Sequence, residues 1–231
     1  MSIKKRLMAA FLIVSMVLCM AVPAFAAAKS GSTAPETTNA NKTFVVKTNM
    51  DNNQQDHNKQ AIVKTEVLSN SATVQSVLHG KDKKPASFVA LTIARDKDNK
   101  KHLITQVGNG KIGVFDSKKG RCVKSVTIGS TKKVTVAPNA FKNSSVNILR
   151  LKSKMVFKAN AFKGTNNAAM KIYVIAPKKT AADFSFASGA FTGLSDKAVF
   201  TVTADAMTAA EFNKLKSKLV KAGFKGKIVR K

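Results

Sequence analysis

Positively charged side chains are the groups in this 231-residue chain whose number and spacing point to chemistry. Lys and Arg together number 40 against 12 Asp and Glu, which gives a formal net charge of +28. The segment 122–182 contains twelve Lys or Arg residues and no acidic residue. Because alternate strand residues face one side of a sheet, we expect a cationic strip formed by Lys124, Arg150, Lys152 and Lys171. Such a strip would attract polyanions through a long-range field that salt weakens.

Outside a cell, the polyanions that such a strip suits are teichoic acids, anionic polysaccharides, lipid head groups and released nucleic acid. Specific nucleic-acid recognition is disfavoured, because the chain has no Trp and one Tyr for base stacking. The same lysines also have a simpler explanation, since lysine keeps a β protein with exposed edges soluble and prevents pairing between molecules. The sequence leaves both interpretations open.

Catalytic and metal-binding patterns are weak in this chain. The segment Gly108–Gly113 matches G-x-G-x-x-G, but no helix follows it, so we interpret it as a glycine turn rather than a nucleotide site. His57, His79 and His102 have no second ligand at metal spacing. Cys122 opens a repeat strand, which favours a core or edge position over a thiol-protease pair with His102. We therefore predict no catalytic residue, no cofactor and no metal.

The N-terminal 26 residues have the pattern of a secretory signal. Lys4–Arg6 form the positive head, Leu7–Met20 the apolar body, and Ala24–Ala26 a small-x-small cleavage site. An uncleaved membrane anchor is the alternative, and Pro23 with the following alanines favours cleavage. We expect a secreted or cell-surface protein of bacterial export, with no transmembrane segment after cleavage. Only Cys122 then remains, which excludes an intrachain disulfide.

A short pattern occurs three times between residues 134 and 193. The copies are Val134-x-Val136-x-x-Asn139-Ala140-Phe141-x-Asn143, Met155-x-Phe157-x-x-Asn160-Ala161-Phe162-x-Gly164, and Phe184-x-Phe186-x-x-Gly189-Ala190-Phe191-x-Gly193. Their spacings of 21 and 29 residues are typical of stacked repeats. We expect each Phe to fill the interior of one unit, and each preceding Ala to let the backbone approach closely.

A second strand precedes each copy. The pattern is Val123-x-x-Val126-x-Ile128, then Val146-x-x-Leu149-x-Leu151, then Met170-x-x-Tyr173-x-Ile175. The third is ambiguous, because Ile172 and Val174 could face inward instead, and a slip of one residue reverses the faces. The third unit is also longer, by several residues around 178–183.

A basic helix is predicted over residues 208–222. Thr208 and Glu211 form a capping-box signal, and Gly223 suits the position after the helix end. Its apolar stripe (Phe212, Leu215, Leu219 and Ala222) has helical spacing. Such a helix can bind a membrane or a partner, but at the end of a repeat array it more commonly covers the last unit. Lys227–Arg230 would add a final strand.

The units "NAFKN", "NAFKG" and "GAFTG", followed by this helix and strand, resemble the BspA-like leucine-rich repeat family of bacterial surface and secreted proteins. The resemblance covers residues 122–231. It implies a right-handed solenoid with a parallel sheet on one side and a role in adhesion or recognition, and it supplies no catalytic residues.

The remaining segments are expected to flank this solenoid. Residues 27–60 read as a polar, largely disordered linker, with a short possible strand at Thr43–Thr48. Residues 61–121 read as an N-terminal β cap, in which Phe88–Ile93 and Leu103–Val107 form a hairpin around a polar turn at 96–99. Ile112–Phe115 would add a strand.

Together these patterns predict a mainly β protein: a short solenoid between a β cap and a capping helix. The expected function is non-enzymatic recognition of an extracellular protein or glycan. The alternative is a cationic cell-envelope protein that binds anionic glycopolymers by charge. A third reading, a hydrolase within residues 61–121, has no motif to support it.

Overall fold

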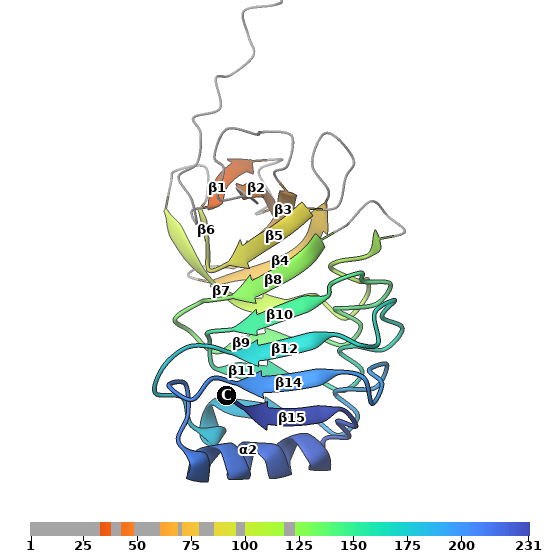
Figure 1. Ribbon diagram of the computed structural model, residues 1–231. Coiled ribbons are helices and arrows are strands. Elements are labelled where there is room, and N and C mark those ends of the chain that lie inside the picture. The colour runs from red at the N-terminus through yellow and green to blue at the C-terminus, as the bar shows by residue number, and fades with distance from the viewer. Residues whose placement is uncertain are drawn as a thin grey trace, which may run out of the picture.

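The computed structural model describes residues 33–37, 43–48, 61–68, 71–78, 86–95, 100–117 and 123–231. Within them the protein is mainly β, with two sheets and one α-helix near the C-terminus (Figure 1). The predicted signal at 1–26 lies outside the described residues, as do Cys122, His57, His79 and the polar turn at 96–99.

One sheet has nine described strands, in the order β1-β2-β3-β4-β7-β9-β11-β13 with β6 beside β7. Pairing is antiparallel from β1 to β4 and between β6 and β7, and parallel from β4 through β7, β9 and β11 to β13. The strands are β1 (Thr33–Thr37), β2 (Thr43–Thr48), β3 (Ala61–Leu68), β4 (Ser71–Leu78), β6 (Ile93–Arg95), β7 (Lys101–Val107), β9 (Val134–Val136), β11 (Met155–Phe157) and β13 (Phe184–Phe186).

The second sheet has six described strands in the order β15-β14-β12-β10-β8-β5, and all its pairs are parallel. The strands are β5 (Ala86–Leu91), β8 (Val123–Ile128), β10 (Ile148–Leu151), β12 (Lys171–Val174), β14 (Val199–Val202) and β15 (Lys227–Arg230). From β8 to β14 the chain alternates between the two sheets, and each return adds a strand beside the previous one.

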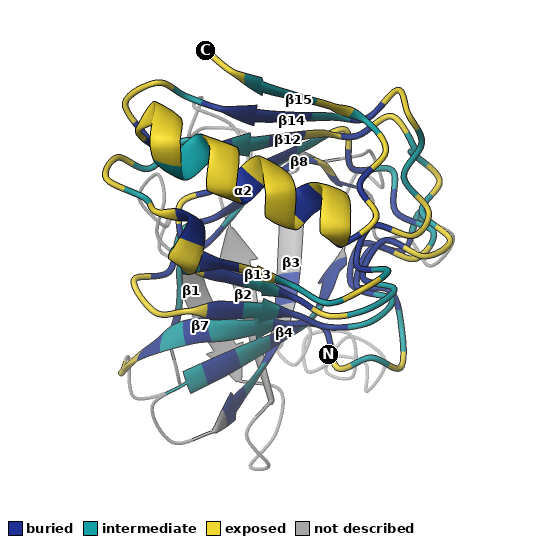
Figure 2. Cartoon of the chain, turned by 90° about the horizontal axis from the view of Figure 1, so that it is seen from below, coloured by how far each residue is buried: buried dark blue, intermediate teal, exposed yellow. Residues whose placement is uncertain are grey.

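The apolar core lies between the two sheets. In the six-stranded sheet, one residue of each strand from β8 to β14 forms a fully buried row across the sheet: Val126, Leu149, Ile172 and Phe200. The helix α2 (Ala209–Lys221) lies across the C-terminal end of the core, as Figure 2 shows from below. It buries Leu215 and Leu219, so the helix covers apolar surface that the last strands would otherwise expose.

Phenylalanine rings stack along the core. The ring centroids of Phe141 and Phe162 lie 4.7 Å apart, and those of Phe162 and Phe191 lie 5.8 Å apart. Phe115 continues the stack before Phe141 at 5.0 Å, and Phe224 meets Phe191 edge-on at 5.2 Å. The three alanines that precede the repeat Phe residues are fully buried: Ala140, Ala161 and Ala190.

Backbone conformation explains why Asn or Gly recurs at two positions of the repeat. The first turn residue of each copy has positive φ (Asn139 58°, Asn160 61°, Gly189 70°), and so does the second (Asn143 56°, Gly164 71°, Gly193 105°). Side chains with a Cβ disfavour this left-handed region, and Gly and Asn are the residues that enter it most readily. The recurring Asn or Gly therefore specifies two left-handed bends around each Ala-Phe pair.

The structure resolves the ambiguous third strand. Ile172 and Val174 are fully buried, in register with Leu149 and Leu151, whereas Tyr173 is half-buried and faces outward beside Arg150. The alignment that placed Tyr173 inward is therefore wrong by one residue, and the alternative face is correct.

Two expectations for the N-terminal part are wrong. Phe88 lies in β5, which joins the six-stranded sheet, so the hairpin partner of β7 is β6, with Ile93 opposite Leu103. No strand forms at 112–115. Val114 and Phe115 instead lie in a turn, where Phe115 joins the ring stack. A large apolar residue beside a turn gives the same short sequence signal as a buried strand.

The polar segment before residue 61 contains two described strands. β2 has the expected bounds Thr43–Thr48 and pairs with β3, and β1 pairs with β2. Thr33–Thr37 thus form a strand where composition predicted a linker, because pairing along a sheet edge needs backbone groups rather than apolar side chains. The rest of residues 27–60 lies outside the described part.

The additional residues of the third unit position α2. Ala181–Asp183 form a short 3₁₀-helix, η3. The Ala181 amide donates to Glu211 Oε2 at 2.8 Å, and Lys218 Nζ donates to the carbonyls of Ala181 (2.6 Å) and Phe184 (3.1 Å). Glu211 therefore links α2 to η3 rather than completing the predicted capping box, although its own amide does donate to Thr208 Oγ1 at 3.3 Å.

Candidate binding surfaces

The outward side of the six-stranded sheet, here called the outer face, is uncovered by any other described element (Figure 1). Strand alternation and register place two rows of side chains on it. One row runs from β5 to β15 through Phe88, Ser125, Ile148, Lys171, Val199 and Lys227, and the other through Ala90, Thr127, Arg150, Tyr173, Thr201 and Val229. The outer face is thus a mixed surface of aliphatic, aromatic, hydroxyl and basic residues, in which Ser125, Thr127 and Thr201 are buried beneath their neighbours.

Arg150 and Tyr173 lie at the centre of the outer face. They are direct cross-strand partners on β10 and β12, and both are half-buried. Arg150 Nη1 donates to Ser125 Oγ at 2.6 Å, which fixes the guanidinium over β8. Tyr173 combines an apolar ring with a hydroxyl, and arginine offers several donors in one plane, so the pair can contact both apolar and polar groups of a ligand.

The four predicted cations lie on neighbouring strands but do not form one row. Lys124 and Lys171 are exposed near the beginnings of β8 and β12, whereas Lys152 is exposed just beyond the end of β10. Arg150 lies between these ends and is engaged with Ser125. Sequence reasoning treated cations alone and therefore missed Tyr173, whose outward direction depends on the register of β12.

A cavity of about 250 Å³ lies between the free edge of β13 and α2. Its lining residues are Phe184, Ser185, Phe186, Ser188, Lys218, Lys221 and Ala222. The Lys218 ammonium already donates to two backbone carbonyls, so it serves to dock the helix. Lys221 is exposed at the rim.

Two carboxylates beside this contact have altered pKa values. The hydrogen bond from Lys214 lowers the pKa of Glu211, and the hydrogen bond from the Ala181 amide lowers it further. Partial burial raises the pKa of Asp183, but hydrogen bonds from Thr180 and Lys154 and the charges of Lys154 and Lys179 outweigh burial and lower it overall. Both groups therefore favour the ionised form in the folded protein.

The glycine turn and His102, which belong to patterns with catalytic or metal-binding associations, do not lie on the outer face. Gly108 and Gly110 have φ of 85° and 83° and form a turn after β7. His102 is buried on β7, with 3% of its surface exposed. Within the described residues, no three His, Cys, Asp or Glu side chains gather closely enough to hold a metal ion.

No family model, curated protein or solved structure matches the chain. Among the described residues, no helix has the length and apolar character needed to cross a bilayer.

Proposed function

We propose that this chain is an exported, non-enzymatic interaction protein that recognises an extracellular protein or glycan through the outer face. The observation that carries the proposal is the Arg150–Tyr173 pair, held by adjacent parallel strands on a face that no described element covers. Tyr and Arg, together with Trp, are enriched at the energetic centres of protein interfaces.

The proposal includes the fold that residues 122–231 adopt: a short, right-handed leucine-rich-repeat solenoid of the BspA-like kind, between a β cap at 61–121 and the capping helix α2. Support comes from the alternation between two sheets, the parallel pairing, and the two left-handed bends in each unit. Stacked units present an extended surface, which suits recognition rather than the enclosed pocket of an enzyme.

Export is proposed on the sequence pattern of residues 1–26, with a basic head, an apolar body and a small-x-small site. An exported chain would meet its ligand at the cell surface or in the medium.

The alternative remains a cationic cell-envelope protein that binds anionic glycopolymers such as teichoic acid or an anionic polysaccharide. Its support is the net charge of +28, not a strip at the four predicted cations, which the register separates.

Binding to a panel of glycans and envelope polymers, measured at low and moderate salt, tests the proposal. The variants Tyr173→Ala and Arg150→Ala should abolish salt-resistant binding. The control is Lys142→Ala, at an exposed residue in a repeat turn, which should leave this binding intact. Binding that moderate salt removes, and that the outer-face variants do not change, would favour the charge-based alternative. Turnover of a panel member would contradict both.

A further inference from the structure

A cationic surface lies where the chain passes from the six-stranded sheet to the nine-stranded sheet. Here the strands β8, β10 and β12 end, and each connection to β9, β11 or β13 carries lysines. We call this surface the lysine corner; its residues are Lys132, Lys133, Lys152, Lys154, Lys178 and Lys179. All are exposed except Lys179, which is half-buried.

Hydrogen bonds hold the first two connections of the lysine corner in register. The Val134 amide donates to the Lys154 carbonyl at 2.8 Å, which places Lys133 beside Lys154. The Lys152 amide donates to the Ile128 carbonyl at 2.8 Å, and the buried Ser153 hydroxyl donates to the Ser130 carbonyl at 2.7 Å. Adjacent strands lie about 4.8 Å apart, so these first two connections repeat their charges along the stacking direction at about that interval, whereas in the longer third connection the Lys179 amide donates to the Ala206 carbonyl at 2.7 Å.

Among the described residues, acidic side chains offset little of this charge. The Lys154 ammonium lies 3.0 Å from an Asp183 carboxylate oxygen, and 58% of the Lys154 side chain is still exposed. Asp205 and Glu211 follow β14, towards the C-terminal end of the stack. Within the described part of the chain, Lys132, Lys133 and Lys152 form no ion pair with an acidic side chain.

The amino-acid composition of the lysine corner limits the kinds of ligand that it can bind. Residues 129–133, 152–154 and 176–180 contain no aromatic residue, so they offer no platform on which bases stack. They also contain no Arg, so each cation of the corner is a compact ammonium group that binds a phosphate as a point charge. We propose that the lysine corner binds a linear phosphate polymer without bases, which lies along the stack so that its phosphates meet the lysines of several connections.

This site is separate from the outer face and does not depend on recognition there. The probe is inorganic polyphosphate, compared with pyrophosphate, poly-glutamate and single-stranded DNA, in titrations of the full chain at several salt concentrations. We expect long polyphosphate to bind far more tightly than pyrophosphate, because a linked ligand engages several connections at once.

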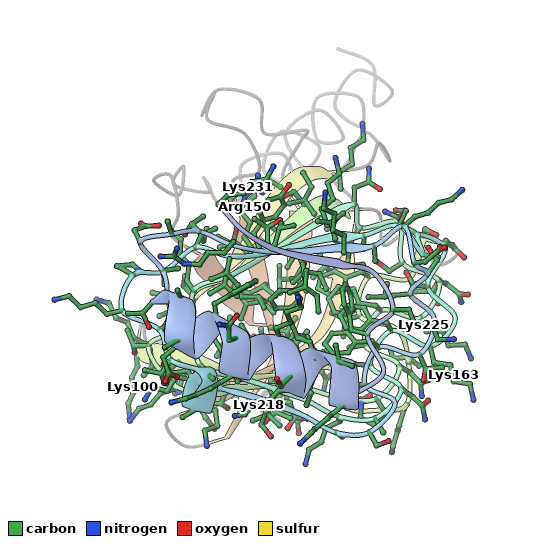
Figure 3. The ribbon with its side chains drawn as sticks, turned by 60° about the horizontal axis from the view of Figure 1, so that its bottom comes forward. Lys100, Arg150, Lys163, Lys218, Lys225 and Lys231 are labelled. Atoms are coloured by element: carbon green, nitrogen blue, oxygen red, sulfur yellow. The ribbon has the colours of Figure 1, made fainter. Side chains whose placement is uncertain are left out.

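The decisive variant is Lys133→Gln/Lys154→Gln/Lys178→Asn, with Asn at the third position because Lys178 has a φ of 56°. Its control is Lys142→Gln/Lys163→Gln/Lys225→Gln, which removes the same charge from exposed turns. Figure 3 shows Lys163 and Lys225 on the side opposite Lys100, which precedes β7 on the side of the corner. We expect the corner variant to bind polyphosphate at least about tenfold more weakly. The slope of log K against log salt concentration should become less steep by about 2 units, and the control should change little in either measure.

Asp183→Asn removes the carboxylate beside Lys154 and should raise polyphosphate affinity, and Tyr173→Ala should not alter it. Equal losses of polyphosphate affinity in the corner and control variants would show that only net charge matters and would contradict the proposed site. Absent polyphosphate binding would overturn it as well. Equal affinity for poly-glutamate or single-stranded DNA would overturn the assignment of a phosphate polymer without bases.

Discussion

At the scale of single residues, the repeat depends on two kinds of position: a ring in the core and a left-handed bend on either side of it. The rings supply apolar area that is removed from water, and the bends bring each ring into the space between the sheets. Both requirements recur in each unit, which is why the pattern can be read from the sequence.

Replacing a stacked ring should be strongly destabilising. Phe162 is fully buried and stacks on Phe141, Phe157 and Phe191. Phe162→Ala should lower the free energy of unfolding by about 3–5 kcal/mol, because it removes the ring and leaves a cavity. Chemical denaturation measures the change, and Val220→Ala, at a residue 58% exposed, is the control with little effect. A loss below about 1 kcal/mol for Phe162→Ala would contradict a shared core stack.

Gly164 and Gly193 occupy equivalent positions in the repeat but should differ in how well they tolerate substitution by Asn. Asn143 occupies the position of Gly164 in the preceding unit at a similar φ, and the nearest atom to an added Cβ at Gly164 is a flexible part of Lys142 at 3.5 Å. Gly164→Asn should therefore change the urea midpoint little.

Gly193→Asn should lower the same midpoint clearly. At Gly193 φ is 105° and an added Cβ would clash with the carbonyl oxygen of Phe162. Equal urea midpoints for the two variants would contradict the difference in backbone surroundings between Gly164 and Gly193. The cost comes from this clash and from strain in the backbone, so no existing side-chain contact needs to be lost.

At the scale of elements, α2 is attached to the rest of the protein by its apolar side chains and by polar contacts to η3. Leu215 and Leu219 are buried, while Glu211 and Lys218 bind the two backbone groups of Ala181. The longer third unit thus supplies the docking point for the helix that closes the end of the core.

Acid should loosen this contact. The folded-state pKa values of Glu211 and Asp183 lie below their ordinary values of 4.5 and 3.8, so their stabilisation is present above those values and is lost as pH falls through the lowered ones. We expect hydrogen exchange in α2 to accelerate relative to the strands as pH falls below 4.5, after correction for intrinsic rates.

The control is Glu211→Gln/Asp183→Asn, which should show faster exchange in α2 already at neutral pH and a weaker dependence on acid. Protection of α2 that stays constant in the unmodified protein from pH 4.5 downwards would contradict the role of these carboxylates.

At the scale of the whole molecule, charge opposes folding while the stacked core favours it. A chain with a net charge of +28 repels itself in the compact state, and dissolved salt screens that repulsion. The exposed lysines also discourage association along the open strand β15, which carries Lys227 and Arg230 at its ends.

The urea midpoint should therefore rise with sodium chloride concentration between low and moderate ionic strength at neutral pH. A chain bearing the six glutamine or asparagine changes of the corner and control variants should show a smaller rise. A midpoint that falls with added salt in the unmodified chain would mean that attractive pairs outweigh the excess positive charge, since salt weakens those as well.

The sequence by itself determined the local elements of the repeats and of the C-terminal helix. Period-2 apolar pairs, the Asn or Gly bends and the capped basic helix appear in the structure within a residue or two, because each depends on interactions between residues close along the chain. Only the tertiary structure decided which strand joins which sheet. It assigned Phe88 to the six-stranded sheet, turned Tyr173 outward, extended the ring stack to Phe115 and Phe224, and aligned the lysine corner. These features depend on register between segments more than twenty residues apart, and a period-2 pattern cannot specify register because a slip of one residue exchanges the two faces.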